Sequence, residues 1–188
     1  LASVAAALTI LPVPGSPAPV SFPGDLILFA YCLGLMRFVT VIAALDTGSS
    51  FGGMGASREV QFAALAEPAL LLGLAALARS GDSLSLSGIF AGLSRSSWAA
   101  SGPALALVAS ALLIVFLAEN SRIPVDDPNT HLELTMIHEV MILDYSGPDL
   151  ALVLYGASLK FFVTASMILN SLLSHWELPS PLAFAAFA

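Results

Sequence analysis

The sequence predicts an all-α, polytopic bundle of transmembrane helices, and three observations predict it. The 188 residues are 57% hydrophobic and only 10% charged, with a mean hydropathy of +0.91, whereas soluble domains are about 25% charged. Four apolar runs of about 20 residues each match the roughly 30 Å hydrocarbon core of a bilayer. No alternating strand pattern competes with them, and only helices and closed barrels satisfy their backbone hydrogen bonds in lipid.

Composition also excludes several function classes. Six Lys and Arg residues stand against 13 Asp and Glu residues, a formal net charge of −7, so the chain lacks the basic patch that nucleic acid requires. Cys32 is the single cysteine, which excludes an internal disulfide framework and a multi-cysteine zinc or iron–sulfur site. An iron–sulfur centre would therefore belong to a partner.

Both ends of the chain have the composition of interrupted membrane helices. Residues 1–11 are apolar, and they lack the basic region that opens a signal peptide. We therefore expect a partial helix at 1–11, another at 181–188, and a chain that is a fragment lacking both ends.

Complete spans are predicted between these ends, at about 25–45, 57–79, 99–118 and 149–173. Asp25 is the expected N-cap of the first span. Ser57 is the expected N-cap of the second, with Glu59 in its positive first turn.

Successive spans alternate in direction, so their loops fall on two membrane faces. Loops 46–56 and 119–148 share the face that we name side A, and loops 12–24, 80–98 and 174–180 share side B. Basic residues near the span ends divide equally between the faces, so the positive-inside rule assigns no orientation. Most of the acids gather on side A: Asp46, Glu59, Glu119, Asp126, Asp127, Glu133, Glu139, Asp144 and Asp149.

Loop 119–148 is too long for a simple turn. Asp127 followed by Pro128 predicts a helix start, and a short amphipathic helix is expected from Pro128 to about Leu143. It could lie at the membrane face or under a docked protein. A second interpretation is a proton-handling cluster, in which neighbouring acids raise one another's pKa. A metal site is disfavoured, because His131 and His138 are seven positions apart and lack the i,i+4 spacing of a helical zinc motif.

Three charged residues are predicted near the middle of the membrane. Helix rise places Glu67, Lys160 and Arg37 about 15, 16 and 18 Å deep, respectively. An unpaired charge there costs at least about 2.5–3.5 kcal/mol. The residues therefore either form an ion pair that fixes helix packing, Glu67 with Arg37 or with Lys160, or line a path for protons or ions. Pro68 predicts a kink beside Glu67.

The glycine-rich segment 46–57 matches no phosphate-binding pattern, since it lacks GxxxxGK[ST] and a preceding strand. Its glycines are expected to allow close backbone packing. Nothing in the chain marks a nucleophile elbow, so no catalytic residue is expected.

Two strings, LDTGSSFGGMGASREVQFAALAEPALLL (45–72) and AENSRIPVDDPNTHLELTMIHEVMILDYSG (118–147), resemble subunit 1 of respiratory complex I. The similarity is closer to the branch of that family found in membrane-bound nickel–iron hydrogenases of the formate hydrogenlyase type. The resemblance implies a membrane subunit that seats a peripheral electron-transfer arm. It also implies acid-rich cytoplasmic loops and buried carboxylates that couple redox chemistry to proton-pumping, antiporter-like subunits.

The resemblance also assigns residues. Arg58 and Glu67 match the arginine and intramembrane glutamate of one family helix. Asp126, Glu133 and Asp144 match acids of the long loop. Three departures from the respiratory branch favour the hydrogenase branch. They are the non-acidic Asn129 and His131, the inserted His138-Glu139 pair, and Ala157 with Lys160 where the respiratory branch has a glutamate.

These observations predict a non-catalytic membrane anchor and proton-coupling subunit of a hydrogenase-type complex. The residues expected to carry or steer protons are Glu67, Glu119, Asp126, Glu133, Glu139 and Asp144. Arg37, Arg58 and Lys160 are expected to tune their charge, and His131 and His138 to relay protons. No metal or cofactor is expected in this chain.

The expected partners are the lipid bilayer, hydrogenase-like large and small subunits with iron–sulfur clusters and a nickel–iron centre, and antiporter-like membrane subunits. The expected location is a prokaryotic cytoplasmic (inner) membrane, with side A cytoplasmic. Two alternatives stay open. One is the quinone-site subunit 1 of an NADH:quinone oxidoreductase, and the other is a stand-alone ion transporter, which would show an inverted repeat with broken helices.

Overall fold

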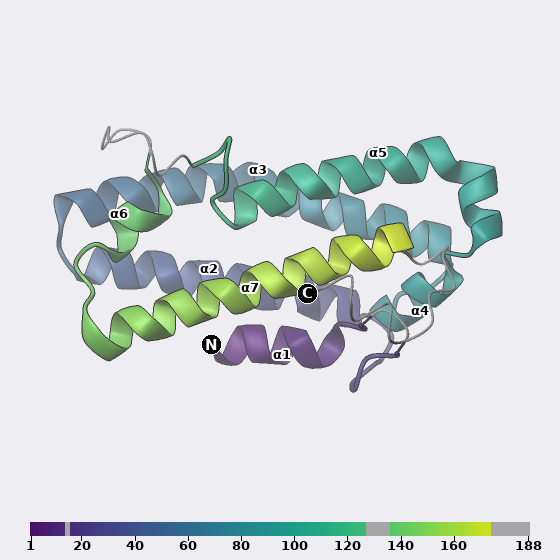
Figure 1. Ribbon diagram of the computed structural model, residues 1–188, viewed down its shortest axis with the longest axis horizontal. Helices are drawn as coiled ribbons and strands as arrows, with labels where there is room; N and C mark the ends of the chain where they lie inside the picture. Colours follow the sequence, from purple (N-terminus) through teal and green to yellow (C-terminus); the bar gives the residue numbers. More distant parts are fainter. Residues whose placement is uncertain (14–15, 127–135, 174–188) are drawn as a thin grey trace.

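The computed structural model describes residues 1–13, 16–126 and 136–173. Within these residues the chain is an all-α bundle, as predicted (Figure 1). Its helices are α1 (Ala2–Ile10), α2 (Asp25–Asp46), α3 (Ser50–Gly81), α4 (Leu86–Gly92), α5 (Arg95–Glu119), α6 (His138–Ile142) and α7 (Gly147–Leu173).

Four of the described helices, α2, α3, α5 and α7, are long and apolar enough to cross a membrane. Many of their large apolar side chains point outward, among them Leu65, Leu72 and Leu107, each of which is more than 70% exposed. A soluble protein rarely exposes apolar surface on this scale, so these faces are those of a membrane protein in contact with lipid or with other membrane helices.

The bundle has two distinct ends. Figure 1 shows α6 with the α2–α3 and α6–α7 connections at one end, which is side A, and α4 at the other, which is side B. α3 packs against α2 and α5, and α7 packs against α1 and α5. A core of buried residues such as Phe29, Leu33, Leu74 and Leu112 lies between them.

The predicted start of the second span was wrong. α3 begins at Ser50 after Ser49 as N-cap, so most of the glycine-rich segment is helical and Ser57 lies inside the helix. The expected close packing is confirmed for Gly52 and Gly55, whereas Gly48 and Gly53 have nothing within 4 Å of a Cβ position. A Cβ on Gly52 would lie 2.9 Å from Ala44 O, and one on Gly55 would lie 2.9 Å from Ile137 O. These approaches offset the low helix propensity of glycine.

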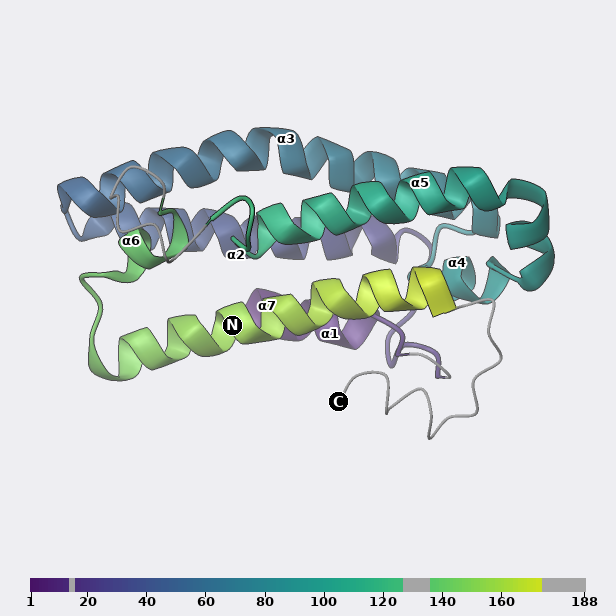
Figure 2. The same cartoon turned by 45° about the horizontal axis from the view of Figure 1, so that its top comes forward.

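The N-cap predicted for the first span and the kink predicted at Pro68 also differ from what the structure shows. The N-cap of α2 is Gly24, and Asp25 is the first helical residue; its buried carboxylate accepts hydrogen bonds from Leu86 N at 2.7 Å and Ser85 Oγ at 2.9 Å. α3 runs through Pro68 as one helix, gently curved in Figure 2. The break lies instead at Ser101 in α5, two residues before Pro103.

In the described part of the long loop, the helix is much shorter than the predicted one from Pro128 to about Leu143. Met136 and Ile137 are not helical, and α6 comprises only His138–Ile142. Asp127, His131 and Glu133 lie outside the described residues, as does the expected partial helix 181–188. The partial helix expected at 1–11 is present as α1, and α4 was not predicted.

Candidate functional site

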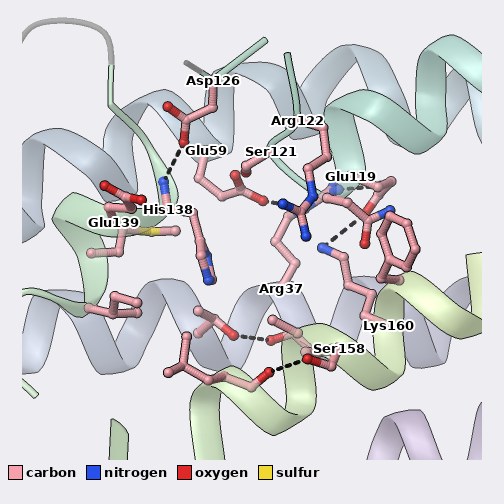
Figure 3. Close-up of a pocket in the computed structure, with 18 of the residues that line it drawn as sticks. Arg37, Glu59, Glu119, Ser121, Arg122, Asp126, His138, Glu139, Ser158 and Lys160 are labelled. Atoms are coloured by element: carbon pink, nitrogen blue, oxygen red, sulfur yellow. Dashed lines mark hydrogen bonds and ion pairs between the residues drawn. The ribbon is translucent and has the colours of Figure 1, made fainter. Parts of the chain in front are cut away.

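A cavity of about 570 Å³ lies between α2, α6, α7 and the segment that follows α5 (Figure 3). Its polar wall carries most of the charged residues near side A, and its apolar wall includes Met36, Leu154 and Phe161. The charged residues that line it are Arg37, Glu59, Glu119, Arg122, Asp126, His138, Glu139 and Lys160.

Arg37 is the centre of the charged wall. It lies halfway along α2, and its side chain is only 5% exposed. Its Nε donates to Glu59 Oε1 at 3.0 Å and its Nη1 to Glu67 Oε1 at 2.9 Å. Its Nη2 forms an ion pair with Glu119 Oε1. All three guanidinium nitrogens are thus engaged with carboxylates, a geometry that the planar fork of arginine favours.

Glu119 and Lys160 extend this network to α7. Glu119 is the last residue of α5, and its side chain is 3% exposed. Its second oxygen, Oε2, lies 3.4 Å from Lys160 Nζ, and Figure 3 shows Lys160 pointing from α7 toward it. This contact is an ion pair without hydrogen-bond geometry, since Oε2 has no hydrogen-bond partner in residues 1–13, 16–126 and 136–173.

Two contacts set the register of α7 against the end of α5. Asn120 Nδ2 donates to Thr164 Oγ1 at 3.0 Å. The rings of Phe116 and Phe161 lie with their centroids 5.0 Å apart, and such tilted aromatic pairs are stabilising. Lys160 is one helical turn before Thr164, so this register brings its ammonium group to Glu119.

The network carries unequal numbers of charges. Glu59, Glu67 and Glu119 supply three carboxylates, whereas Arg37 and Lys160 supply two cations. With every group ionised, one negative charge remains without a cation inside this network. Burial penalises an uncompensated charge heavily, and this network is one positive charge short of balance.

Glu67 differs from the other two acids in its surroundings. Its side chain is 48% exposed, although it lies near the middle of the membrane-spanning α3. It does not line the cavity, and it is connected to the cavity through Arg37. Glu67 therefore places one end of the charge network at the outer surface of the bundle, near the middle of α3.

α6 covers the cavity from side A, and polar contacts hold it there. Asp126 Oδ2 accepts hydrogen bonds from Ile137 N at 3.1 Å and His138 N at 3.0 Å. Arg58 Nη1 donates to Met136 O at 2.8 Å. Beyond α6, the Tyr145 hydroxyl donates to Ala43 O at 2.8 Å. The segment around α6 is thereby fastened to α2 and α3.

His138 points its imidazole into the cavity (Figure 3). Its Nε2 is buried and has no hydrogen-bond partner within the described part of the chain. Burial lowers the pKa of His138, the positive charges of Lys160 and Arg122 lower it further, and Asp126 opposes this effect. The free nitrogen of a neutral imidazole can accept a proton, and the imidazolium that forms can pass a proton on.

The structure brings together only some of the predicted site residues. Arg37, Glu119, Asp126, His138, Glu139 and Lys160 line one cavity, and Glu67 joins them through Arg37. Arg58 holds the α6 segment and does not line the cavity. Asp144 is exposed beyond α6 and does not line it either. His131 and Glu133 lie outside the described residues.

Glu59 was not among the predicted site residues. Its assignment to the first helical turn near the membrane surface followed from the misplaced start of α3. The signal that could have found it is its spacing, because Glu59 and Glu67 are eight positions apart and share the broad face of one helix. Among the described residues, no three His, Cys, Asp or Glu side chains form a group able to hold a metal ion.

Comparisons with known proteins agree with this architecture. A family model described as NADH dehydrogenase matches residues 1–188. Hydrogenase-4 component C of Escherichia coli (strain K12) is 37% identical over 150 residues, which cover 80% of this chain and 46% of that protein. Formate hydrogenlyase subunit 4 of the same organism is 34% identical over 168 residues, which cover 89% of this chain and 52% of that protein. The chain thus spans about half the length of the curated relatives it matches.

Proposed function

Because this chain belongs to the NADH dehydrogenase family, as a complex I subunit 1-like membrane protein, we propose that it is a membrane subunit of a hydrogenase-type oxidoreductase complex. In this role it anchors a peripheral electron-transfer arm and couples redox chemistry to proton translocation. The names of the two Escherichia coli relatives support the hydrogenase assignment. Iron–sulfur clusters and a nickel–iron centre would reside in the peripheral large and small subunits.

The observation that carries the coupling role is the buried charge network. It runs from the cavity below α6 through Glu119 and Arg37 to Glu67. Ionisable groups inside a membrane are expensive, and they are retained mainly where ions or protons move. A packing role alone would be served by one neutral pair, whereas this network leaves one negative charge that a proton can balance.

The cavity supplies the entrance for protons. Asp126, His138 and Glu139 line its side A end. His138 and Glu119 line the same cavity. Their buried Nε2 and Oε2 atoms have no hydrogen-bond partner among the described residues, and polar atoms of this kind are satisfied by water when the space admits it. Water between them would let a proton pass from His138 to Glu119.

Glu67 supplies the exit toward a neighbouring subunit. A half-exposed carboxylate at mid-membrane depth is costly against lipid, so another membrane helix should cover it. An antiporter-like subunit that presents a polar group at this depth would extend the path. We further propose that side A faces the cytoplasm of a prokaryotic inner membrane, where the peripheral arm would dock over α6.

The cavity also favours a second candidate, the quinone-site subunit of an NADH:quinone oxidoreductase. Its volume of about 570 Å³ falls within the range of small-molecule pockets. Its apolar wall could hold a ring and His138 could bond a carbonyl oxygen. Turnover that depends on added quinone, and is lost in His138→Leu, would select this candidate over the hydrogenase type.

The proposed function can be tested on the full-length protein in its native membrane. A tagged copy should co-purify with a nickel-containing large subunit, and Glu67→Gln should abolish proton translocation by vesicles while hydrogen evolution continues. Asp82→Asn, a matched change at an exposed acid on side B, should preserve both. A complex without a nickel-containing subunit would contradict the hydrogenase assignment, and unchanged translocation in Glu67→Gln would contradict the proton path.

A further inference from the structure

The two oxygens of the buried Glu119 carboxylate have unequal partners. Oε1 is held in a close ion pair by Arg37 Nη2. Oε2 lies 3.4 Å from Lys160 Nζ and accepts no hydrogen bond from the residues that the structure describes. Since both oxygens belong to a side chain that is 3% exposed, Oε2 is the position at which the carboxylate can take up a proton without breaking a hydrogen bond.

The two cations also differ in their freedom to move. Arg37 is fixed by Glu59, Glu67 and Glu119 from two other helices. Lys160 has Glu119 as its one ion-pair partner among the described residues. Lysine carries a compact charge on a flexible four-carbon stem, and Lys160 borders the cavity. The ammonium group therefore has space to move into, whereas the guanidinium group does not.

Every element around the cavity presents charged groups toward this space. Besides Glu119 these are Arg37 from α2, Glu59 from α3, Arg122 and Asp126 from the segment after α5, and His138 and Glu139 from α6. Asp126 is committed to two backbone amides, and Glu139 is exposed at the side A end. Glu59 is the remaining buried carboxylate; it lines the same cavity as Lys160, and its Oε1 accepts a hydrogen bond from Arg37 Nε.

We propose that Lys160 is a switchable counter-ion, paired with Glu119 while that carboxylate is ionised and shifted to Glu59 once Glu119 is protonated. The idea rests on the proposed function and assigns a regulatory step to the same site. The incoming proton forms one O–H bond at Glu119 Oε2, and the ammonium keeps its three protons. Neutral Glu119 no longer attracts the buried ammonium, so the ammonium moves to the carboxylate that is still charged.

This movement controls when Glu119 holds its proton and when it releases it. While Lys160 is away, Glu119 holds its proton more firmly, because one of its two cations is absent and only Arg37 remains beside it. When Lys160 returns, its charge again favours the carboxylate, and the proton leaves through the network. Lys160 is thus a positioning residue that acts through Glu119.

The structural test compares the wild-type complex with Glu119→Gln, in which the amide imitates a protonated carboxyl group. Lys160 Nζ should leave residue 119 and lie within about 3 Å of a Glu59 oxygen. An ammonium that stays at residue 119 would overturn the proposal. If the variant fails to assemble, the functional test below decides the proposal, because its Lys160 variants leave Glu119 in place.

The functional test uses Lys160→Met, with Arg95→Met as a matched loss of charge at the exposed start of α5. Lys160→Met should lose proton translocation and keep hydrogen evolution, Lys160→Arg should restore translocation in part, and Lys160→Met should add no loss in a Glu119→Gln background. Wild-type translocation in Lys160→Met, or a parallel loss of translocation, hydrogen evolution and complex yield, would overturn the proposal. Wild-type vesicles that form no proton gradient would instead overturn the proposed function.

Discussion

Arg37 Nη1 donates a hydrogen bond to Glu67 Oε1 at 2.9 Å, and this contact joins a buried guanidinium group to a half-exposed carboxylate in the middle of α3. The same guanidinium binds Glu59 and Glu119 inside the bundle. One side chain therefore connects the interior of the cavity with the outer surface of the bundle near the middle of α3. This connection makes the stability and the protonation of the network testable by single substitutions.

Replacement of Arg37 should destabilise the bundle strongly. Arg37→Met leaves Glu59 and Glu119 buried without their main cation, and removing one partner of a buried ion pair costs about 3–5 kcal/mol. The thermal unfolding midpoint in detergent should fall well below that of the wild type. Arg79→Gln, a change at an exposed residue in the last turn of α3, should leave the midpoint nearly unchanged. Equal midpoints for the two variants would contradict the central position of Arg37.

The seating of α6 on α3 depends on Gly55. A Cβ there would lie 2.8 Å from Met141 Cγ and 2.9 Å from Ile137 O, so Gly55→Ala should cost about 1–3 kcal/mol of stability through overpacking. Gly53 has nothing within 4 Å of its own Cβ position. Gly53→Ala should therefore be neutral or stabilising, by up to about 1 kcal/mol from helix propensity. Thermal unfolding of the two variants measures the difference, and a stable Gly55→Ala variant would refute the close approach.

Asp126 should control how firmly α6 is held. Asp126→Ala removes the acceptor of the Ile137 and His138 amides, and buried amides left without partners are unfavourable. Hydrogen–deuterium exchange of a peptide covering residues 136–143 should become faster than in the wild type. Asp144→Ala changes an exposed acid nearby and should leave that exchange unaltered. Unchanged protection in Asp126→Ala would show that other contacts hold α6.

His138 should make the fold sensitive to acid. Its pKa in the folded protein is lowered from 6.5, mainly by burial, so between the two pKa values the unfolded chain binds more protons than the folded one. Stability is therefore full above about pH 6.5 and is lost as the pH falls through the lower pKa of the folded state. The unfolding midpoint of the wild type should drop more between about pH 7.5 and about pH 5.5 than that of His138→Gln. Equal drops would mean that His138 protonates freely in the folded protein.

Hydropathy predicted the architecture because span length and charge scarcity depend only on the solvent that surrounds the helices. It also predicted the apolar spans that carry Arg37 and Lys160, which lie within α2 and α7. The start of α3 was missed because its glycines have low helix propensity. The compensating contacts of Gly52 with α2 and of Gly55 with the α6 segment are tertiary, and a single sequence does not display them.

The same error concealed Glu59. With a helix start at Ser57, Glu59 belongs to the surface, whereas the true start at Ser50 puts it more than two turns inside α3, where it meets Arg37. The position of a charged residue along its helix also does not predict which acid pairs with which cation. The pairing of Lys160 with Glu119 depends on the register of α7 against α5, which Asn120 and Thr164 set.

The most direct measurement of proton coupling is redox-triggered infrared difference spectroscopy of the complete complex, which records the C=O stretch of carboxyl groups that change protonation during turnover. A carboxyl band that shifts in D₂O should appear in the wild type and in Asp82→Asn. It should be lost or altered in both Glu67→Gln and Glu119→Gln. A wild-type spectrum without such a band, or a band that neither substitution changes, would contradict proton transfer through the Glu119–Arg37–Glu67 network.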